Sequence, residues 1–438
     1  MRIVFVEGVS GVGKSTLTRK LCERLKEVGH SADCHIEFDF TNPIDFYCAA
    51  YFNQREYEAL LADFPEHRSA IESNTIAADD IRLVRYYNRE APLFSEPLLG
   101  TLSKRELCFN PDVPISLHEF TRVYKSVWDN FTRNTNSECE YLLFDGSLFH
   151  HPINDLMRNY NVSKEQAISH VNTLIEAVIP LNPLVVYLSS ENVAERLKKA
   201  RECRKQSSPS DEYIQFWKER KQMDLAVMQQ ISIPYDIHDI SQENWDSLID
   251  TIVAHILETP EERRARIYPI VLQKYNPAWP EWYMEEKAKL EQLIGIENIA
   301  KINHYGSTSV PGLTAKPTVD ILLEIKEGVD LRHVASLLPE SEYFCQWRDI
   351  PDDPLILYKG YTPIGFAEKV YHVHVRYSGD WDELYFRDYL IAHPEAAVKY
   401  AALKYRLMKE FEHDRDGYTD AKGAFIREVT EMARKGIV

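Results

Sequence analysis

The first half of the chain alternates between short apolar runs and stretches with helical spacing. Between the first two apolar runs, residues 14–28 carry leucines about one helical turn apart and end at Gly29, which predicts a helix. A last helix is expected over about 244–257. Four apolar runs predict buried strands: residues 2–6, 36–38, 141–145 and 184–188. Strands that alternate with helices predict an α/β domain with a parallel sheet and helices on both faces.

The pattern changes in the second half. A charged segment that starts at a proline, residues 259–266, has few apolar positions and is predicted to be a connector. A new pattern begins near Ile270, with an amphipathic helix expected at about 280–293. We therefore predict two domains, residues 1–260 and 266–438, because 438 residues are too many for one ordinary core.

Composition narrows the class of protein. The formal net charge of −17 disfavours duplex nucleic acid as a ligand, because phosphate backbones require a basic face. The seven cysteines are scattered, without a CxxC pair, as expected for reduced thiols. No targeting segment and no apolar run near 18 residues are visible, so we expect a soluble, cytoplasmic protein without a membrane partner. The sequence leaves the oligomeric state open.

The segment after the first strand carries the clearest chemistry. It reads Gly-Val-Ser-Gly-Val-Gly-Lys-Ser and matches the phosphate-binding loop GxxxxGK[ST], with a strand before it and a helix after it. Lys14 is predicted to bridge the β- and γ-phosphates of a nucleoside triphosphate, and the Ser15 hydroxyl to ligate Mg²⁺. The residues predicted to bind ATP here are Gly8, Ser10, Gly11, Val12, Gly13, Lys14, Ser15 and Thr16.

Two acids follow other predicted strands. Asp145 closes the run 141–144 and is the candidate for a second Mg²⁺ ligand, although an acid there also suits a simple turn. Glu37 lies at the end of the second predicted strand, where a general base for an acceptor hydroxyl would lie; an ordinary surface glutamate is the alternative.

A basic helix follows the strand at 184–188. Residues 195–205 are rich in arginine and lysine and run into a polar loop, which is typical of a lid that closes over a triphosphate. Arg201 and Arg204 are the candidates to stabilise charge during phosphoryl transfer. A solvated helix face is the alternative.

These features together resemble the thymidylate kinase and deoxynucleoside kinase group of P-loop proteins. The resemblance covers about the first 258 residues, through the Gly8–Thr16 loop, the triplet 145–147, the strand near 187 and the basic helix. It implies a kinase in which residues 41–135 form the acceptor pocket. We expect that stretch to be mostly helical, with an aromatic and basic group at Arg82, Arg85, Tyr86 and Tyr87. Gly146 departs from the Asp-Arg-Ser triplet usual in the group.

The second half contains a Gly-Ser turn about a dozen residues before an acid that opens an apolar strand. The turn, Gly306–Ser309, offers backbone N–H groups and hydroxyls to a phosphate, and Asp320 would face that phosphate as a metal ligand. Lys316 precedes the strand and adds charge. We predict an anionic ligand held by Gly306, Ser307 and Lys316; a tight turn whose hydroxyls satisfy local backbone groups is the alternative.

This half closely resembles the GrpB family, over about residues 270–430. The resemblance rests on the 306–313 loop, Asp320, the His-Val-His-Val run at 372–375 and the Phe-Arg-Asp-Tyr-Leu run at 386–390. It continues through Tyr400, Lys404, Tyr418 and Lys422. It implies an α+β, nucleotidyltransferase-like fold, but the family's biochemical role is poorly defined. Fusions of this family to dephospho-CoA kinase are known.

Active nucleotidyltransferases place two acids as DxD on one strand face, roughly 7 Å apart. Here the second position is Leu322, and Glu324 lies about 13 Å from Asp320 along a strand, too far to share a metal ion. His372 and His374 share a strand face as further ligands or as packed histidines. Arg387, Lys404 and Lys422 are predicted on helices, either lining an anion groove or exposed.

We therefore predict an ATP- and Mg²⁺-dependent kinase that acts on a small metabolite of the nucleoside or nucleotide kind. Its accessory second domain binds or modifies a nucleotide or phosphorylated ligand. Two alternatives stay open: a nucleotide-dependent switch with slow turnover, and a nucleotidyltransferase whose chemistry resides in the second domain. The sequence does not name the acceptor or distinguish ATP from GTP.

Overall fold

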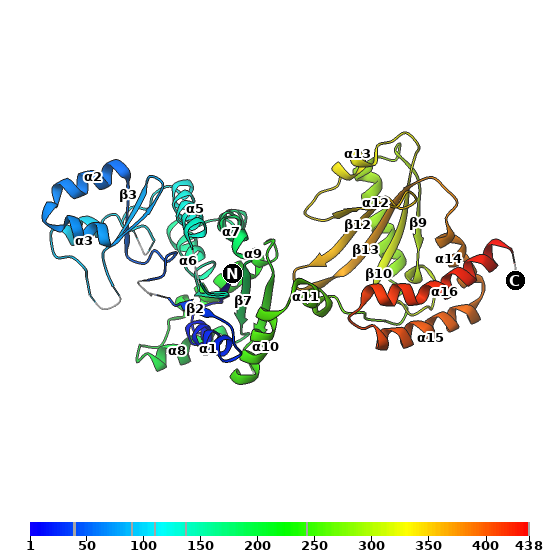
Figure 1. Cartoon of the computed structure of the whole chain (residues 1–438), viewed down its shortest axis with the longest axis horizontal. Helices are drawn as coiled ribbons and strands as arrows, with labels where there is room; N and C mark the ends of the chain where they lie inside the picture. The colour runs from blue at the N-terminus through cyan, green and yellow to red at the C-terminus, as the bar shows by residue number, and fades with distance from the viewer. Residues whose placement is uncertain (38–40, 89–90, 109–110, 136–137, 242–243, 437–438) are drawn as a thin grey trace. The chain divides into compact units, whose positions relative to one another are not determined.

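The chain forms two compact units, residues Met1–Leu257 and Glu258–Val438 (Figure 1). The structure is a computed structural model that describes residues 1–37, 41–88, 91–108, 111–135, 138–241 and 244–436. None of the helices in this described part combines the length and the hydropathy that a membrane span requires.

Five parallel strands form the central sheet of the first unit, as predicted. Their order is β2-β6-β1-β7-β8. β1 therefore lies between β6 and β7, which come much later in the sequence. The second strand was predicted at residues 36–38, and this is wrong: β2 ends at His35, Ile36 and Glu37 lie outside any strand, and Phe38 lies outside the described residues. The bounds are β1 (Arg2–Glu7), β2 (Ala32–His35), β6 (Tyr141–Asp145), β7 (Leu184–Ser189) and β8 (Tyr235–Asp239).

Helices cover both faces of this sheet, which confirms the predicted α/β class. On one face α1 (Lys14–Glu27), α8 (Val193–Cys203) and α10 (Trp245–Leu257) pack on a core that includes Val4, Val6 and Leu188. On the other face Phe5, Phe144 and Trp128 belong to a second core. The helices around that core are α5 (Leu117–Asn134), α6 (His150–Asn159) and α7 (Lys164–Val178), with the 3₁₀ turn η2 (Ile179–Leu181); α9 (Asp211–Met228) contacts both α7 and α8.

The segment 41–135 is not mostly helical, contrary to the prediction. It contains a three-stranded antiparallel sheet in the order β3-β5-β4. β4 and β5 form a hairpin at Asp79, and β3, which comes earlier in the sequence, pairs with β5. No strand of this sheet exceeds five residues, so the alternation of apolar and polar residues is too short to predict these strands. The bounds are β3 (Ala49–Asn53), α2 (Gln54–Asp63), η1 (Pro65–His67), α3 (Arg68–Ser73), β4 (Thr75–Ala78), β5 (Ile81–Arg85) and α4 (Leu98–Ser103).

The second unit begins with a helix where a connector was predicted. α11 (Pro260–Ile267) forms because Thr259 and Glu262 make a reciprocal capping box and Pro260 occupies the first turn. The predicted amphipathic helix is α12 (Trp279–Ile294).

The sheet of the second unit is mixed, in the order β11-β12-β13-β10-β9, with β10 and β13 parallel. The odd-numbered residues of β10, such as Ile321, pack with α12 and α13 in one core, so Asp320 and the other even-numbered residues face the opposite side. The bounds are β9 (Ile299–Tyr305), η3 (Ser307–Ser309), β10 (Thr318–Ile325), α13 (Leu331–Ser336), β11 (Phe344–Trp347), β12 (Leu355–Thr362), β13 (Gly365–Tyr377), α14 (Asp382–Ala392), α15 (Pro394–Glu410) and α16 (Arg415–Arg434).

Candidate functional site

The loop between β1 and α1 has the backbone of a phosphate site. Gly8, Gly11 and Gly13 have φ angles of 139°, 85° and 94°, which L side chains rarely adopt. A Cβ atom at Gly8 would lie 2.6 Å from the Leu188 carbonyl oxygen. Only glycine is therefore accommodated here, and the start of α1 is left open to an anion. Of the other predicted loop residues, Ser10 and Ser15 are half-buried, Val12 is buried and Thr16 is exposed.

Lys14 lies over this loop and is buried by its neighbours. Its Nζ is 3.5 Å from the Val9 carbonyl oxygen and 3.3 Å from Nδ1 of His150. The His150 ring stacks on Trp217 with centroids 5.3 Å apart. Burial and the Lys14 charge hold the pKa of His150 well below its usual value, so a neutral imidazole lies beside Lys14, and the same Nδ1 is 3.2 Å from the Gly8 carbonyl oxygen. Sequence reasoning missed His150, which comes from an unrelated segment 136 positions away.

Asp145 ends β6 beside Val6 of β1, at the carboxyl edge of the sheet. It is completely buried, and its Oδ2 accepts a hydrogen bond from the Glu37 N–H at 3.2 Å. Its Oδ1 is buried without a hydrogen-bond partner among the described residues. An orphaned carboxylate oxygen of this kind, at the carboxyl edge of the sheet, suits a Mg²⁺ ligand set.

Glu7 is a second buried acid that the sequence analysis did not single out. Its two oxygens accept hydrogen bonds from the Leu148 N–H at 2.8 Å and the His150 N–H at 3.0 Å. Burial raises the pKa of Glu7 to about 7. Glu7 thus connects the end of β1 to the start of α6 and positions His150. Its place directly before Gly8 is the feature of the sequence that could have identified it.

Gly146 lies at a crowded position of the first unit. Gly146 has a φ of 69°, and a Cβ atom there would lie 3.0 Å from the His150 Cβ and 3.3 Å from the Lys14 Cε. The space that an arginine stem would need is therefore filled by His150 and Lys14.

A small cavity of about 80 Å³ lies beside this cluster. Residues from the segment 41–135 line it, as expected for an acceptor pocket, but Arg82, Arg85, Tyr86 and Tyr87 do not. Glu37 is at this cavity, and its Oε1 lies 3.9 Å from Nε2 of both His150 and His151. The lining comprises Glu37, Asp45, Phe46, Tyr47, Cys108, Tyr124, His150, His151, Asn154, Asp155 and Arg158.

The basic helix α8 packs against the phosphate loop. A Cβ atom at Gly11 would lie 2.9 Å from the Arg196 carbonyl oxygen. Arg201 bonds the loop that follows α8, where its Nε donates to the Ser207 carbonyl oxygen at 2.6 Å. Arg204 is exposed at the end of α8. The structure therefore brings Lys14, Asp145 and Glu37 together, but not Arg201 or Arg204.

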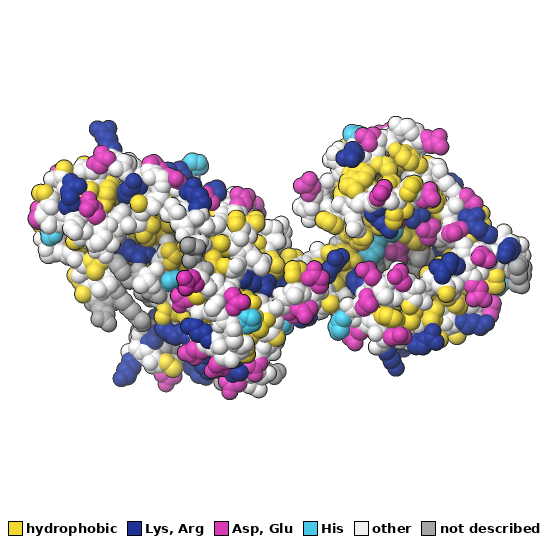
Figure 2. All heavy atoms as spheres, viewed as in Figure 1, with side chains coloured by type: hydrophobic (Ala, Val, Ile, Leu, Met, Phe, Trp, Pro, Cys, Tyr) yellow, Lys and Arg dark blue, Asp and Glu magenta, His cyan; other side chains and the backbone are white. Residues whose placement is uncertain are grey.

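A larger cavity of about 1160 Å³ lies in the second unit. It is bounded by the even-numbered face of β10 and β13 and by helices α14 to α16, and Figure 2 shows the unit hollowed, with histidine visible inside. Gly306, Ser307, Lys316 and Asp320 all line it. The lining also includes the polar and aromatic residues Phe344, Tyr358, Tyr361, His372, His374, Lys404, Arg415, Tyr418 and Lys422.

The turn at 306–309 contributes only part of what the sequence predicted. The Ser309 hydroxyl donates to the Gly306 carbonyl oxygen at 2.6 Å, and the Thr308 hydroxyl bonds the Thr318 carbonyl oxygen at 3.2 Å. These two hydroxyls satisfy local backbone groups, whereas Ser307 faces the cavity and accepts from Lys404 Nζ at 3.0 Å. Asp320 packs so closely on Gly306 that a Cβ atom at Gly306 would collide with its carboxylate.

The three helix cations proposed from the sequence separate into two groups. Lys404 and Lys422 line the cavity, whereas Arg387 donates to the His304 carbonyl oxygen at 2.9 Å and does not line it. His372 lies 3.5 Å from Asp320, and His374 pairs with Asp353 at 3.0 Å. The histidines are therefore both hydrogen-bonded and exposed to the cavity.

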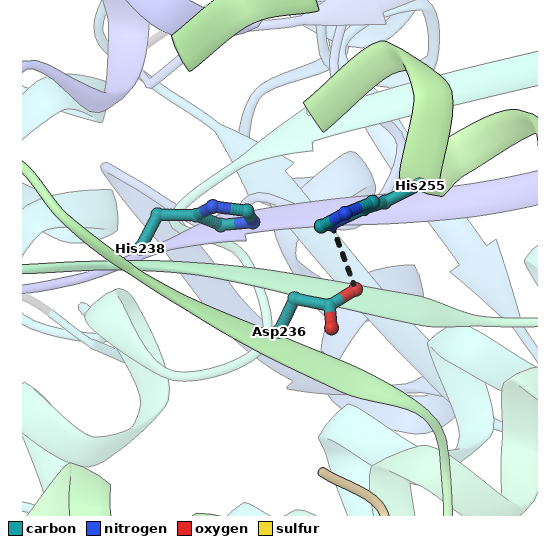
Figure 3. Close-up of side chains that lie close together, drawn as sticks. All are labelled: Asp236, His238 and His255. Carbon is teal, nitrogen blue, oxygen red and sulfur yellow. Dashed lines mark ion pairs between the residues drawn. The ribbon is translucent and has the colours of Figure 1, made fainter. Parts of the chain in front are cut away.

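A third polar cluster lies between β8 and α10 of the first unit (Figure 3). Asp236 and His238 share one face of β8, and His255 faces them from α10 with its Nδ1 3.8 Å from the Asp236 carboxylate. The possible ligand atoms of these three residues lie within 4.8 Å of one another. As it stands, the cluster is an ion-pair contact that fastens the last helix to the edge strand.

Comparison with known proteins identifies the second unit. The family model described as GrpB protein matches residues 269–432. A UPF0157 protein from Pseudomonas aeruginosa is 35% identical over 160 residues, 36% of this chain and 65% of that protein. The glutamate-rich protein GrpB of Alkalihalophilus pseudofirmus is 31% identical over 164 residues, 36% of this chain and 93% of that protein.

A solved structure and a more distant relative were also found. The crystal structure of conserved protein GrpB from Enterococcus faecalis is 32% identical, covers 38% of this chain and 98% of that one, and has a TM-score of 0.34. A dephospho-CoA kinase from Mycolicibacterium paratuberculosis is 25% identical over 224 residues, 46% of this chain and 54% of that protein. The match over nearly the full length of the Alkalihalophilus protein places this chain, through its second unit, in the GrpB family.

Proposed function

We propose that the first unit is an ATP-dependent phosphotransferase that acts on a small hydroxyl- or phosphate-bearing metabolite of the nucleoside or nucleotide kind. The observation that carries the proposal is the convergence of Lys14 and Asp145 at the carboxyl ends of two adjacent parallel strands. Binding at that edge is the general rule for open α/β sheets. The relative named dephospho-CoA kinase supports a nucleotide-related function.

In this proposal the chain's own residues bind and orient the reactants. Lys14 exchanges its contact with His150 for the β- and γ-phosphates of ATP, and Ser15 and Asp145 are the residues that would hold Mg²⁺. When bound, Mg²⁺ neutralises charge on the transferred phosphoryl group. Glu37, at the mouth of the small cavity, accepts the proton of the acceptor hydroxyl. Closure of the α8 segment would bring its arginines over the triphosphate, because in the present form Arg201 bonds the segment's own loop.

We propose further that the second unit binds a nucleotide or another phosphorylated ligand in its cavity. Three lysines from separate parts of the chain, Lys316, Lys404 and Lys422, line that cavity, in a protein with a net charge of −17. Such a concentration of like charge favours an anionic ligand.

The proposal for the first unit is tested by incubating the protein with Mg-ATP and a cellular metabolite extract. A metabolite that gains the mass of one phosphate, and that is missing with Lys14→Ala, is the expected result. A gain of one nucleoside monophosphate that persists in Lys14→Ala would assign the chemistry to the second unit instead. ATP turnover with no modified metabolite would contradict the kinase and favour a nucleotide-dependent switch.

A further inference from the structure

The surroundings of Asp320 do not suit the divalent cation that a nucleotidyltransferase-like site implies. The next residue on the same strand face, Leu322, is completely buried and offers no ligand atom. Glu324 accepts hydrogen bonds from the Asn303 side chain and the Gly379 N–H, each at 3.3 Å, and does not line the cavity. Asp320 therefore lacks a second acid from its own strand with which to share a metal ion.

Cations surround Asp320 instead. Lys316 precedes β10, Lys404 comes from α15 and Lys422 from α16, and Asp320 acts electrostatically on all three. Burial, reinforced by the neighbouring cations, lowers the pKa of Lys316 and of Lys404 to about 7. The lining also contains Asp382, Glu383, Asp416 and Glu431, but Asp320 is the acid that acts on all three lysines. The part of the cavity around Asp320 therefore suits a ligand with several negative charges.

Aromatic rings hold the ammonium groups in place. The Lys316 and Lys422 nitrogens lie 5.3 Å and 4.5 Å from the centroid of the Tyr418 ring, and the Lys404 nitrogen lies 4.7 Å from that of Tyr400. Tyr418 is itself fully buried, and its hydroxyl has no hydrogen-bond partner among the described residues. A buried orphan hydroxyl beside two lysines is an unfilled donor for an anionic group.

A hydrogen-bonded chain ends beside the acid. Arg415 donates to the Tyr361 hydroxyl at 3.1 Å, and that hydroxyl lies 2.7 Å from Nε2 of His372. Because burial holds the pKa of His372 well below its usual value, its neutral ring accepts from Tyr361 at Nε2 and directs its Nδ1–H toward Asp320, 3.5 Å away. Burial raises the pKa of Asp320, and the neighbouring lysines act in the opposite direction. Its carboxyl group lines the cavity, where it is able to accept a hydrogen bond from a ligand hydroxyl.

The other side of the cavity is aromatic. Phe344 on β11 is 67% exposed although it lines the cavity, and it pairs across strands with Tyr358, whose ring centroid is 6.3 Å away. Tyr361 continues this surface toward Arg415. The cavity volume lies at or above the roughly 300–1,000 Å³ common for small-molecule sites, so it accommodates more than a free phosphate.

We propose that the second unit binds an organic polyphosphate without a divalent cation, its phosphates on Lys316, Lys404 and Lys422 and its planar apolar part against Phe344 and Tyr358. This inference rests on the proposed phosphorylated ligand of the second unit and specifies its charge, its shape and its independence of metal. The lysines do here what Mg²⁺ does in two-acid sites: they neutralise the phosphates. Asp320 binds a ligand hydroxyl rather than a metal ion.

The test uses the full-length Lys14→Ala protein, so that the phosphate loop of the first unit contributes little. Calorimetric titration at pH 7.5 in EDTA compares orthophosphate, inorganic triphosphate and ATP. We expect ATP to bind more tightly than inorganic triphosphate, and orthophosphate to bind at least tenfold more weakly than triphosphate. Lys422→Met and Lys316→Met should each weaken triphosphate binding about tenfold or more, whereas Lys399→Met, on the exposed side of α15, should not.

Phe344→Ala provides the matched test of the aromatic side. It should remove the advantage of ATP over inorganic triphosphate and leave triphosphate binding unchanged, because Phe344 is exposed and carries no charge. Circular dichroism and thermal unfolding check that each variant folds, and Lys422→Arg, which keeps the charge, should retain binding.

The outcomes separate the two levels of the proposal. Binding that appears only when Mg²⁺ replaces EDTA would overturn the metal-free inference and leave the phosphorylated ligand standing. No binding of any phosphate compound up to millimolar concentration, with or without Mg²⁺, would overturn both. Equal binding by the lysine variants and the parent would show that the anion lies elsewhere.

Discussion

At the scale of single residues, the proposed phosphate site of the first unit is held by buried polar groups whose partners are distant in the sequence. Lys14 contacts His150, His150 donates its N–H to Glu7, and Asp145 accepts from Glu37. Apart from the half-buried Glu37, each of these residues is buried, so each loses hydration and requires its partner. A ligand that replaces one contact, such as a phosphate on Lys14, is therefore met by groups that are already oriented.

Lys14→Ala is expected to remove most ATP-dependent phosphoryl transfer while the protein stays folded. The loss of one charge-stabilising group costs on the order of 3–4 kcal/mol in the transition state, roughly 10²–10³ in rate. Steady-state phosphoryl transfer and thermal unfolding measure the two effects. Lys20→Ala, an exposed lysine on the same helix, serves as control. Near parental turnover in a folded Lys14→Ala protein would contradict the phosphotransferase proposal.

Asp145→Ala should raise the Mg²⁺ concentration needed for half-maximal phosphoryl transfer, because it removes the carboxylate proposed to hold the ion. The measurement is the Mg²⁺ dependence of the initial rate at fixed ATP. Glu7→Gln is a useful comparison: it alters a buried acid of the same cluster that is not proposed as a ligand, and should leave the Mg²⁺ dependence unchanged. If Asp145→Ala leaves that dependence unchanged, another acid is the ligand.

Binding of ATP to the second unit should weaken as pH rises from 7.5 to 9. The pKa of Lys316 and of Lys404 is lowered to about 7, and that of Lys422 to about 8, by burial, so these groups lose protons over this range in the free protein. The anion binds the protonated forms and raises their pKa, so binding takes up protons. Calorimetry of Lys14→Ala in EDTA, in buffers of different ionisation enthalpy, measures this uptake. An affinity that rises with pH would contradict it.

At the scale of elements, both candidate sites lie where a strand end meets a helix or turn with positive φ glycines. In the first unit, Gly13 precedes α1 and Gly146 follows β6. In the second, Gly306 follows β9 and allows Asp320 to pack against the turn. Glycine is needed at these positions for a steric reason: a side chain at Gly146 or Gly306 would enter the space of a functional group.

A comparison of Gly146→Ala with Gly29→Ala tests this packing. Both positions have positive φ, so both substitutions carry left-handed strain of about 1–2 kcal/mol. A Cβ at Gly29 meets open space, whereas a Cβ at Gly146 crowds His150 and Lys14. Gly146→Ala should therefore lower the melting temperature further and reduce phosphoryl transfer at least tenfold, and Gly29→Ala should retain activity. Equal effects of the two substitutions would show that backbone strain alone is responsible.

At the scale of the whole molecule, the chain consists of two units with separate cores. The apolar cluster that contains Ile321 includes residues only from the second unit, and those that contain Phe5 and Val4 include residues only from the first. Each unit thus buries its own apolar surface, the main stabilising contribution to folding.

Expressed separately, residues 1–257 and 258–438 should each unfold in one cooperative transition. The prediction follows from their separate cores, and differential scanning calorimetry of the two fragments checks it. The boundary lies before α11, so a fragment that starts at residue 268 provides a control that lacks this helix. Fragments that are soluble only when they are co-expressed would indicate a shared core.

The local sequence was sufficient where a structure depends on neighbours along the chain. The strand-loop-helix at 2–27 and the strands at 141–145 and 184–189 follow from apolar runs and glycines, because backbone sterics act within a few residues. The resemblance at 269–432 depends on motifs of the same local kind.

Tertiary structure decided everything that depends on pairing between distant segments. The β3-β5-β4 sheet escaped prediction because its short strands are specified by one another. His150 and Glu7 were missed because only the fold brings them to Lys14. In the sequence, Lys316 is a basic residue before a strand, and Lys404 and Lys422 are two lysines on helices. They act on one another only because three separate elements enclose one cavity. Charge and burial act through space, so a sequence names the groups and the fold determines which of them meet.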